Sequence, residues 1–318
     1  MELSYMKGMI PRGTGLTGFV SKIGEHRHCK SAEEIASSIS LQDSLMCAEG
    51  IIAVGDICNG GSTFDVKQKS GIYYHSFIEL FGTSDIFEKD VVAAGLRIGE
   101  QASEKGLRWS LTPHSTYSVP DSLFRGIVTA DTDKSPLSVH FMESRDEYDL
   151  YRNEGAMAAR FRNIGFSPDF LHYGSPARRL VASVPKEIPL TLIHNTFVTE
   201  EDIEMLESHF DNITWVVCPR SNDYIEGVAS PLNLLNSMGV NVAIGTDSLA
   251  SNDSLSIADE IRYILQRGIS FETAVKWATF GGTKALGIND WAGSFSEGKC
   301  PGVVLADNFN CDNIKRLL

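Results

Sequence analysis

Several features that mark large classes of proteins are missing from this 318-residue sequence. No glycine-rich G-x-G-x-x-G or G-x-x-x-x-G-K-[ST] loop follows any of the expected strands, which argues against dinucleotide and nucleoside-triphosphate binding. Basic residues are scattered apart from the pair Arg178–Arg179, and the net charge is −13, so a nucleic-acid polymer is a poor partner. A small or neutral substrate suits such a chain better.

Signals for oxidised thiols, membranes and export are missing as well. The six cysteines form no C-x-x-C pair, so we expect reduced thiols. No apolar stretch approaches the roughly 18 residues of a membrane span. The start MELSYMKGMIPRG also lacks the basic-then-apolar layout of a signal peptide. We therefore expect a soluble, cytoplasmic protein with no membrane partner. Its oligomeric state stays open, although a homodimer is the commonest assembly.

The sequence does contain a regular alternation of apolar runs with helix-like stretches. Such an order predicts a parallel sheet, and near-continuous apolar strands predict burial on both faces. A doubly wound sheet is the competing architecture, but seven successive units favour a TIM-type (β/α) barrel, which has eight strands when complete. The seven expected strands are 51–57, 71–80, 107–115, 136–141, 189–195, 213–219 and 241–247.

Helix boundaries are indicated most clearly at two places. The stretch from Ser31 to Gly50 begins with acids in its first turn and ends on glycine, and another helix begins after Thr199 with three acids. Further helices are expected near 84–105, 120–132, 144–163, 230–239, 255–267 and 270–281.

Polar residues end several of the expected strands. His114, His140, His194 and Asp247 are the last or nearly last residues of four runs, and Glu143 follows His140 by three positions. In a barrel the carboxyl ends of the strands meet at one rim, where the loops form the active site. A single histidine in such a position is usually structural, but the joint placement of these residues predicts a functional site.

Imidazole nitrogens and carboxylate oxygens suit Zn²⁺ or Fe²⁺, and a catalytic site keeps one position for water. We predict one divalent ion bound by His140, Asp247 and His194. Asp247 could also take the proton of the water, and His194 could steady hydroxide instead of ligating. Glu143 is placed to pass a proton to a leaving nitrogen. These alternatives stay open at the level of sequence.

Other candidates carry less weight. Glu79 ends a strand and is a candidate substrate contact. His26 and His28 form an H-x-H pair, but their polar context indicates solvated surface. Cys218 ends a buried strand with no base tied to it, which is typical of an inert thiol.

A set of motifs resembles the amidohydrolase superfamily in order and spacing. Its deaminase and chlorohydrolase branch, which includes cytosine, guanine, adenosyl-homocysteine and aminofutalosine deaminases, is the most similar. The motifs are TPHSTYSVP (112–120), VHFMESRDE (139–147), LIHN (192–195), CPRSN (218–222), GTDSLASNDSLSIADEIR (245–262) and the tail stretch GSFSEGKCPG.

The resemblance implies a metal-dependent barrel with assigned residues. His140 and Asp247 match the metal ligands of the family, and Glu143 matches its proton shuttle. His194 matches the residue that steadies the hydroxide or carbonyl, and His114 matches a substrate contact.

The sequence also departs from the family pattern. Relatives carry H-x-H, which supplies two metal ligands, at the end of the first strand, and they build a small β-sandwich from both chain ends. The segment that follows H-x-H in relatives resembles ELSYMKGMIPRGTGL, which begins here at Glu2. We therefore expect a barrel that lacks its first strand over residues 1–288, with a sandwich remnant over 289–318. Two protein ligands in place of four would weaken metal binding, and the open barrel edge would leave backbone groups unpaired.

Two hypotheses from different classes follow. The first is a metal-dependent hydrolase of non-peptide C–N bonds, with a deaminase of an amino-substituted purine- or nucleoside-like ring favoured over a chlorohydrolase. The second is a truncated, metal-free barrel that acts only in binding or assembly. One sequence does not name the substrate, because the shape of its loops decides specificity.

Overall fold

The computed structural model describes residues 1–82, 88–130, 135–308 and 311–317. All seven expected strands are present and pair in parallel, in two sheets. The first sheet contains β1 (Ala53–Cys58), β2 (Tyr73–Leu80) and β3 (Arg108–Pro113). The second contains β4 (Leu137–Phe141), β5 (Leu190–His194), β6 (Ile213–Val217) and β7 (Val242–Ile244).

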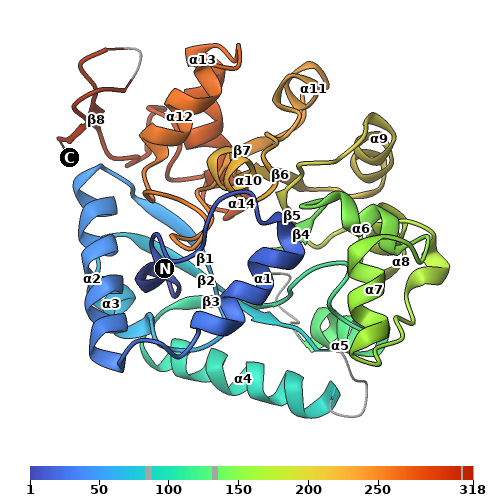
Figure 1. Ribbon diagram of the computed structural model, residues 1–318. Coiled ribbons are helices and arrows are strands. Elements are labelled where there is room, and N and C mark those ends of the chain that lie inside the picture. Colours follow the sequence, from blue (N-terminus) through green and yellow to red (C-terminus); the bar gives the residue numbers. More distant parts are fainter. Residues whose placement is uncertain (83–87, 131–134, 309–310, 318) are drawn as a thin grey trace.

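The two sheets continue into each other. Ser115, just beyond β3, forms a parallel bridge with His140 of β4, and the His140 N–H donates to the His114 carbonyl at 2.9 Å. The strands therefore follow one another in sequence order, without the reversal that defines a doubly wound sheet. Helices surround the strands on the outside (Figure 1). The fold is of the TIM-barrel type, although no ladder among the described residues joins β7 back to β1.

The first two helices precede β1, and the other helices connect or follow the strands. They are α1 (Gly15–His26), α2 (Ala32–Ala48), α3 (Phe64–Lys69), α4 (Glu88–Glu104), α5 (Asp121–Ala130), α6 (Arg145–Leu150), α7 (Gly155–Asn163), α8 (Pro176–Ser183), α9 (Glu200–His209), α10 (Pro219–Glu226), α11 (Leu232–Ser237), α12 (Ile257–Leu265), α13 (Phe271–Lys276) and α14 (Gly282–Ala285).

The two best-marked helix starts are confirmed. Ser31 and Glu34 form a capping box before α2, and Thr199 and Asp202 form one before α9. Other boundaries differ from the expectation. The stretch expected as one helix at 144–163 is divided into α6 and α7, because Asn153 between them takes a left-handed conformation (φ +60°) that interrupts a helix. Residues 84–87 and 131–132 of two expected helices lie outside the described residues.

Helix α1 was not expected from the sequence. Its first turn lies in the stretch GTGLTG at 13–18, which has the spacing of a dinucleotide loop. No strand leads into this stretch, however; the preceding regular element is a short 3₁₀ turn at Ser4–Met6. The structural context that such a loop requires is therefore missing.

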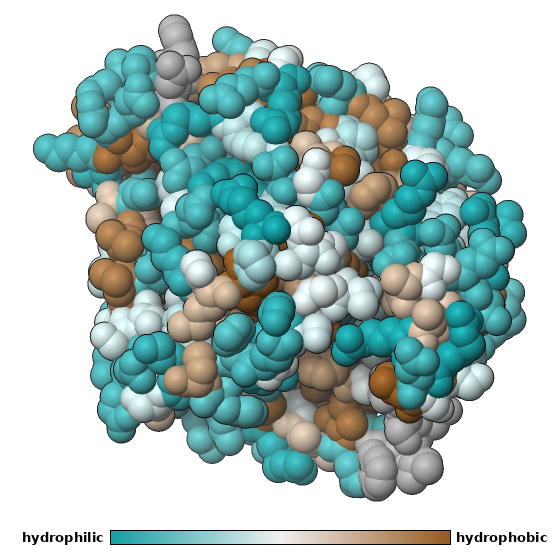
Figure 2. Space-filling model, viewed as in Figure 1, coloured by the Kyte–Doolittle hydropathy of each residue, from teal (hydrophilic) through white to brown (hydrophobic). Residues whose placement is uncertain are grey.

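The main apolar core lies between the strands and the helices that cover them. Fully buried Phe124 of α5, Phe141 of β4, Leu206 of α9 and Trp215 of β6 all belong to it. The sequence therefore buries apolar residues of strands and helices together, as a barrel requires. On the face shown in Figure 2, hydrophilic side chains cover most of the surface and apolar residues form small separate areas.

The last described residues form a short antiparallel hairpin of β8 (Val304–Leu305) and β9 (Lys315–Arg316), close to α2. The predicted domain boundary at 288/289 stays a prediction. Among the helices that the structure describes, none combines the length and the apolar character that a membrane crossing needs.

Two adjacent glycines allow a matched test of the packing between the α13–α14 region and β7. A Cβ on Gly281 would lie 1.9 Å from the Val242 carbonyl oxygen, whereas a Cβ on Gly282 would meet nothing within 4 Å. We expect Gly281→Ala to lower the free energy of unfolding by about 3 kcal/mol or more. Gly282→Ala should change it by less than about 1 kcal/mol, because alanine favours helix. Urea denaturation measures both, and equal effects would contradict this packing.

Candidate active site at the carboxyl ends of the strands

The structure gathers the predicted histidines at one rim of the sheet. The rings of His114 and His140 stack with centroids 4.8 Å apart, and those of His140 and His194 with centroids 5.3 Å apart. They reach the rim because three adjacent parallel strands, β3, β4 and β5, end there in register. Three of the predicted site residues therefore lie side by side, with stacked rings that the sequence did not indicate.

Glu79 of β2 lies beside this row. Its Oε1 is 3.2 Å from Nδ1 of His140, and its Oε2 accepts a hydrogen bond from Asn59 Nδ2 at 3.0 Å. The Nδ1 atom of His140 is also 2.8 Å from the His114 carbonyl oxygen, to which its N–H donates. Oε1 of Glu79 is therefore a buried carboxylate oxygen in a charge contact, without a hydrogen bond of its own.

The Glu79–His140 contact determines the protonation of both groups. Burial by itself would lower the pKa of His140, but contact with the Glu79 carboxylate outweighs it and raises the pKa to about 10. Burial would raise the pKa of Glu79, but the charges of His114 and His140 and the contacts with His140 and Asn59 lower it. Without a metal ion, Glu79 is thus an anion and His140 a cation at neutral pH.

Glu143 is buried in the loop after β4. Its Oε1 lies 3.5 Å from Nε2 of His194, and its Oε2 accepts a hydrogen bond from the Tyr117 hydroxyl at 3.4 Å. Met142, which precedes it, has φ +48° and so turns the chain sharply at the end of the strand. Tyr117 was missed by sequence reasoning, even though it lies within the quoted motif TPHSTYSVP.

The orientation of His194 is fixed by Asn222 of α10. Asn222 Nδ2 donates to Ser230 Oγ at 2.7 Å and to the His194 carbonyl at 3.4 Å, so its Oδ1 must face His194 Nδ1, 2.8 Å away. Because Oδ1 is only an acceptor, this network assigns the proton of the neutral imidazole to Nδ1. In that neutral form the lone pair lies on Nε2, which is 3.5 Å from Oε1 of Glu143.

Asp247 follows β7 with φ +54°. Its Oδ2 accepts hydrogen bonds from Ser221 Oγ at 2.7 Å and Ser251 Oγ at 2.5 Å. Its loop is held by Asn252, whose side-chain amide donates to the Thr246 carbonyl at 2.8 Å. Two hydroxyl groups therefore compensate the carboxylate that ends this buried strand.

One group of side chains has the arrangement of a metal site. Ligand atoms of Glu79, His114 and His140 all lie within 4.8 Å of one another, and the described residues contain no other such group. One carboxylate and two imidazoles match a zinc site that leaves a position open. The Glu79 oxygen without a hydrogen bond is available as a ligand. His194 and Asp247 are not part of this group, so the ligand set His140, Asp247 and His194 stays a prediction.

The less favoured candidates behave as surface or core residues. His28 is exposed and His26 half-buried, and neither belongs to the one metal-ligand group found among the described residues. Cys218 is buried, and burial raises the pKa of its thiol well above the usual value, as for an inert cysteine.

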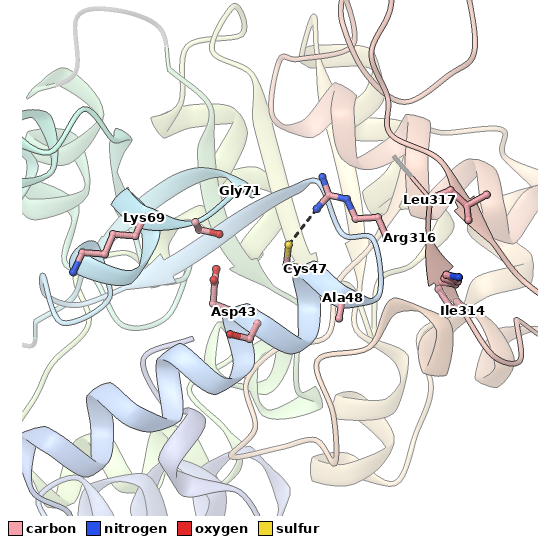
Figure 3. Close-up of a pocket in the computed structure, with 11 residues that line it drawn as sticks. Asp43, Cys47, Ala48, Lys69, Gly71, Ile314, Arg316 and Leu317 are labelled. Atoms are coloured by element: carbon pink, nitrogen blue, oxygen red, sulfur yellow. Dashed lines mark hydrogen bonds between the residues drawn. The ribbon is translucent and has the colours of Figure 1, made fainter.

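A separate groove of about 750 Å³ lies between α2, the segment before β2 and β9. In Figure 3, Arg316 reaches towards Cys47, and its Nη1 lies 3.1 Å from the Cys47 sulfur. None of the candidate site residues lines this groove. The candidate site is therefore separate from this groove.

Comparison with known families agrees with this geometry. The profile of the family described as "Amidohydrolase family" matches residues 83–314, which include most of the strands and five of the six predicted site residues. This chain belongs to the amidohydrolase family.

Individual relatives of this amidohydrolase chain include enzymes named as deaminases. The "Adenosine deaminase" of Helicobacter pylori is 27% identical over 270 residues, which are 83% of this chain and 64% of the relative. The chain thus spans less than two thirds of the length of that relative.

Two solved structures share the fold. The aminofutalosine deaminase of Helicobacter pylori, in complex with methylthio-coformycin, has a TM-score of 0.81 and 24% identity, covering 95% of this chain and 74% of its own. An adenosine deaminase of Xanthomonas campestris with bound zinc has a TM-score of 0.76 and 22% identity, covering 96% and 69%. At 24% and 22% identity, the similarity to these two structures supports the barrel fold alone.

The charge contact at the rim can be measured in metal-free protein. We expect the histidine ring resonances of His140 to titrate near pH 10, and Glu79→Gln to lower that pKa because the anion is lost. NMR titration measures the shift. His75 serves as an internal reference, because burial lowers its pKa and its Nε2 is hydrogen-bonded to Ser110. An unchanged His140 titration in Glu79→Gln would contradict the contact.

Proposed function

We propose that this chain forms the catalytic barrel of a hydrolytic deaminase that acts on an amino-substituted purine- or nucleoside-like ring. The observation that carries the proposal is the buried Glu143 carboxylate, held between His194 and Tyr117 at the rim that His140 also reaches. Deamination requires a positioned side chain that transfers protons in a site that excludes most water. The buried carboxyl group of Glu143 is such a side chain. The names of the relatives support this class of substrate.

The residues would divide the work as follows. Water adds to the ring carbon that bears the amino group, and ammonia leaves. Glu143 takes one proton from the attacking water and passes it to the ring nitrogen; it then takes the proton of the new hydroxyl group and passes it to the amino nitrogen, which leaves as ammonia. Asn222 holds the Nδ1 proton of His194, so the Nε2 lone pair beside Glu143 can accept a hydrogen bond from the attacking water and orient it. Asp247 is the second acid–base candidate at the rim.

A divalent ion fits this rim, and zinc is bound in a related fold. When bound, the ion lowers the pKa of water to roughly 7 and so supplies hydroxide at neutral pH. We infer that His140 is one of its ligands, because it belongs both to the set predicted from sequence and to the group with Glu79 and His114. The distances favour Glu79, His114 and His140 as the ligand set. In that arrangement Glu79 and His114 ligate the ion and do not serve as substrate contacts.

The catalytic role of Glu143 has a direct test. We expect the purified chain, supplied with zinc, to release ammonia from adenosine or 5-methylthioadenosine. Glu143→Gln should lower the rate by about 10²- to 10⁴-fold, because a positioned proton carrier contributes that much. The matched control is Glu201→Gln on the exposed side of α9, which should keep the wild-type rate.

Other outcomes of this assay contradict the proposal. A Glu143→Gln variant as fast as the wild type would remove Glu143 from the reaction. No ammonia from the wild type, with no zinc bound, would favour the competing hypothesis of a metal-free barrel that acts in binding or assembly.

Metal content distinguishes the two ligand sets without any assay of activity. After dialysis against zinc and then buffer, we expect His140→Ala and Glu79→Gln to lose most of the zinc, and Asp247→Asn to keep it. Plasma mass spectrometry measures the zinc. The rise of the melting temperature on adding zinc provides a second readout, because an ion bound only by the folded state stabilises it. Loss of zinc in Asp247→Asn with retention in Glu79→Gln would establish His140, Asp247 and His194 instead.

A further inference from the structure

Glu147 of α6 is a buried carboxyl group that the proposed reaction does not use. Its side chain is fully buried, and no lysine, arginine or histidine among the described residues forms an ion pair with it. An ionised carboxylate without a compensating cation is costly in such a place. Its presence next to the candidate active site therefore calls for a physical reason.

The contacts of Glu147 join two loops of the rim. One carboxyl oxygen, Oε1, forms a short hydrogen bond with the Thr116 hydroxyl in the loop after β3. The other, Oε2, accepts the backbone N–H of Glu143, in the loop after β4, at 3.3 Å. One buried carboxyl group thus connects the segment that carries Tyr117 with the segment that carries Glu143.

Both segments are fixed on their other sides. The Thr116 carbonyl accepts hydrogen bonds from the Tyr151 hydroxyl and from Arg179 Nη1, each at 2.8 Å. On the β4 side, the Met142 carbonyl accepts the Phe197 N–H at 3.0 Å. Glu147 connects the two segments between these fixed points. The Tyr117 hydroxyl of one segment and the Glu143 carboxylate of the other are hydrogen-bonded to each other.

The protonation of Glu147 is consistent with such a link. Burial raises its pKa to about 8, and the nearby charge of Glu143 adds to this effect, although hydrogen bonds from Thr116 and the backbone oppose it. A neutral carboxylic acid has one O–H donor and one carbonyl acceptor. Its two oxygens accept from the Thr116 hydroxyl and from the Glu143 N–H, and in the neutral form it places no second negative charge beside Glu143.

We propose that Glu147 is a positioning residue that holds the loops after β3 and β4 together, so that Tyr117 and Glu143 keep their contact in the active site. This inference rests on the proposed deaminase function. Glu147 does not touch substrate; it acts through Glu143 and Thr116. A glutamine can keep both contacts, because its carbonyl oxygen accepts the Glu143 N–H and its amide N–H donates to the Thr116 hydroxyl oxygen, whereas an alanine makes neither.

The test compares three variants in steady-state kinetics. We expect Glu147→Ala to lower kcat about a hundredfold with KM little changed, because a misplaced catalytic group costs that much without altering binding. Thr116→Val should lower kcat in the same direction, and Glu147→Gln should restore a rate close to that of the wild type. Arg145→Ala, an exposed position on the same helix, is the control for damage to α6.

Other kinetic results overturn the inference. A Glu147→Gln variant as slow as Glu147→Ala would show that the charge of Glu147, and not its hydrogen bonds, is needed. If all variants, including Arg145→Ala, lose kcat and stability to the same extent, Glu147 has only a structural role. If Glu147→Ala does not fold, Thr116→Val and Glu147→Gln decide between these results.

Crystal structures of the variants separate this inference from the proposed function. We expect the Tyr117–Glu143 contact to persist in Glu147→Gln and to be lost in Thr116→Val or Glu147→Ala. An intact contact in the variants that lack the link contradicts the inference, even if the wild type proves to be a deaminase. A lost contact supports it, even if the substrate class proves wrong.

Discussion

Buried charge at the carboxyl ends of parallel strands is the constraint on which this site depends. Glu79, His140, Glu143 and Asp247 all lie where apolar strands end, and each must be compensated within the protein. Different elements provide the compensation: β2 and β4 pair Glu79 with His140, whereas serine hydroxyls of α10 and of the loop after β7 bind Asp247. The barrel makes these pairings possible because parallel strands in sequence order bring their polar ends to one rim.

A second consequence of the same constraint is that supporting residues matter as much as those that face substrate. Asn222 fixes which nitrogen of His194 carries the proton, and Glu147 ties the loop of Glu143 to that of Thr116. Hydrogen-bond networks of this kind hold acid–base groups in reacting geometry, which is how a rigid scaffold contributes to rate. The proposed chemistry of this amidohydrolase thus depends on contacts between loops.

Much of the fold could be predicted because its signals are local. The seven apolar runs are long and uninterrupted, and the caps at Ser31 and Thr199 combine a hydroxyl with an acid three residues later. The division of α6 from α7 depends instead on left-handed residues such as Asn153, whose conformation the helical pattern of 144–163 did not reveal. The short polar helix α10 also lacks a long apolar period by which it could be recognised. The same contrast holds for the site. The residues at strand ends could be proposed from their positions in the sequence. The roles of Tyr117 and Asn222 and the contact of Glu79 with His140 depend on segments that are far apart in the sequence.

The central claim is that this rim of imidazoles and carboxylates holds a divalent ion for hydrolysis. Anomalous diffraction at the zinc edge from crystals grown with equimolar zinc tests it most directly. We expect one anomalous peak within bonding distance of His140 and close to Glu143. A peak elsewhere, such as in the groove beside Cys47 and Arg316, or no peak at the rim, would contradict it.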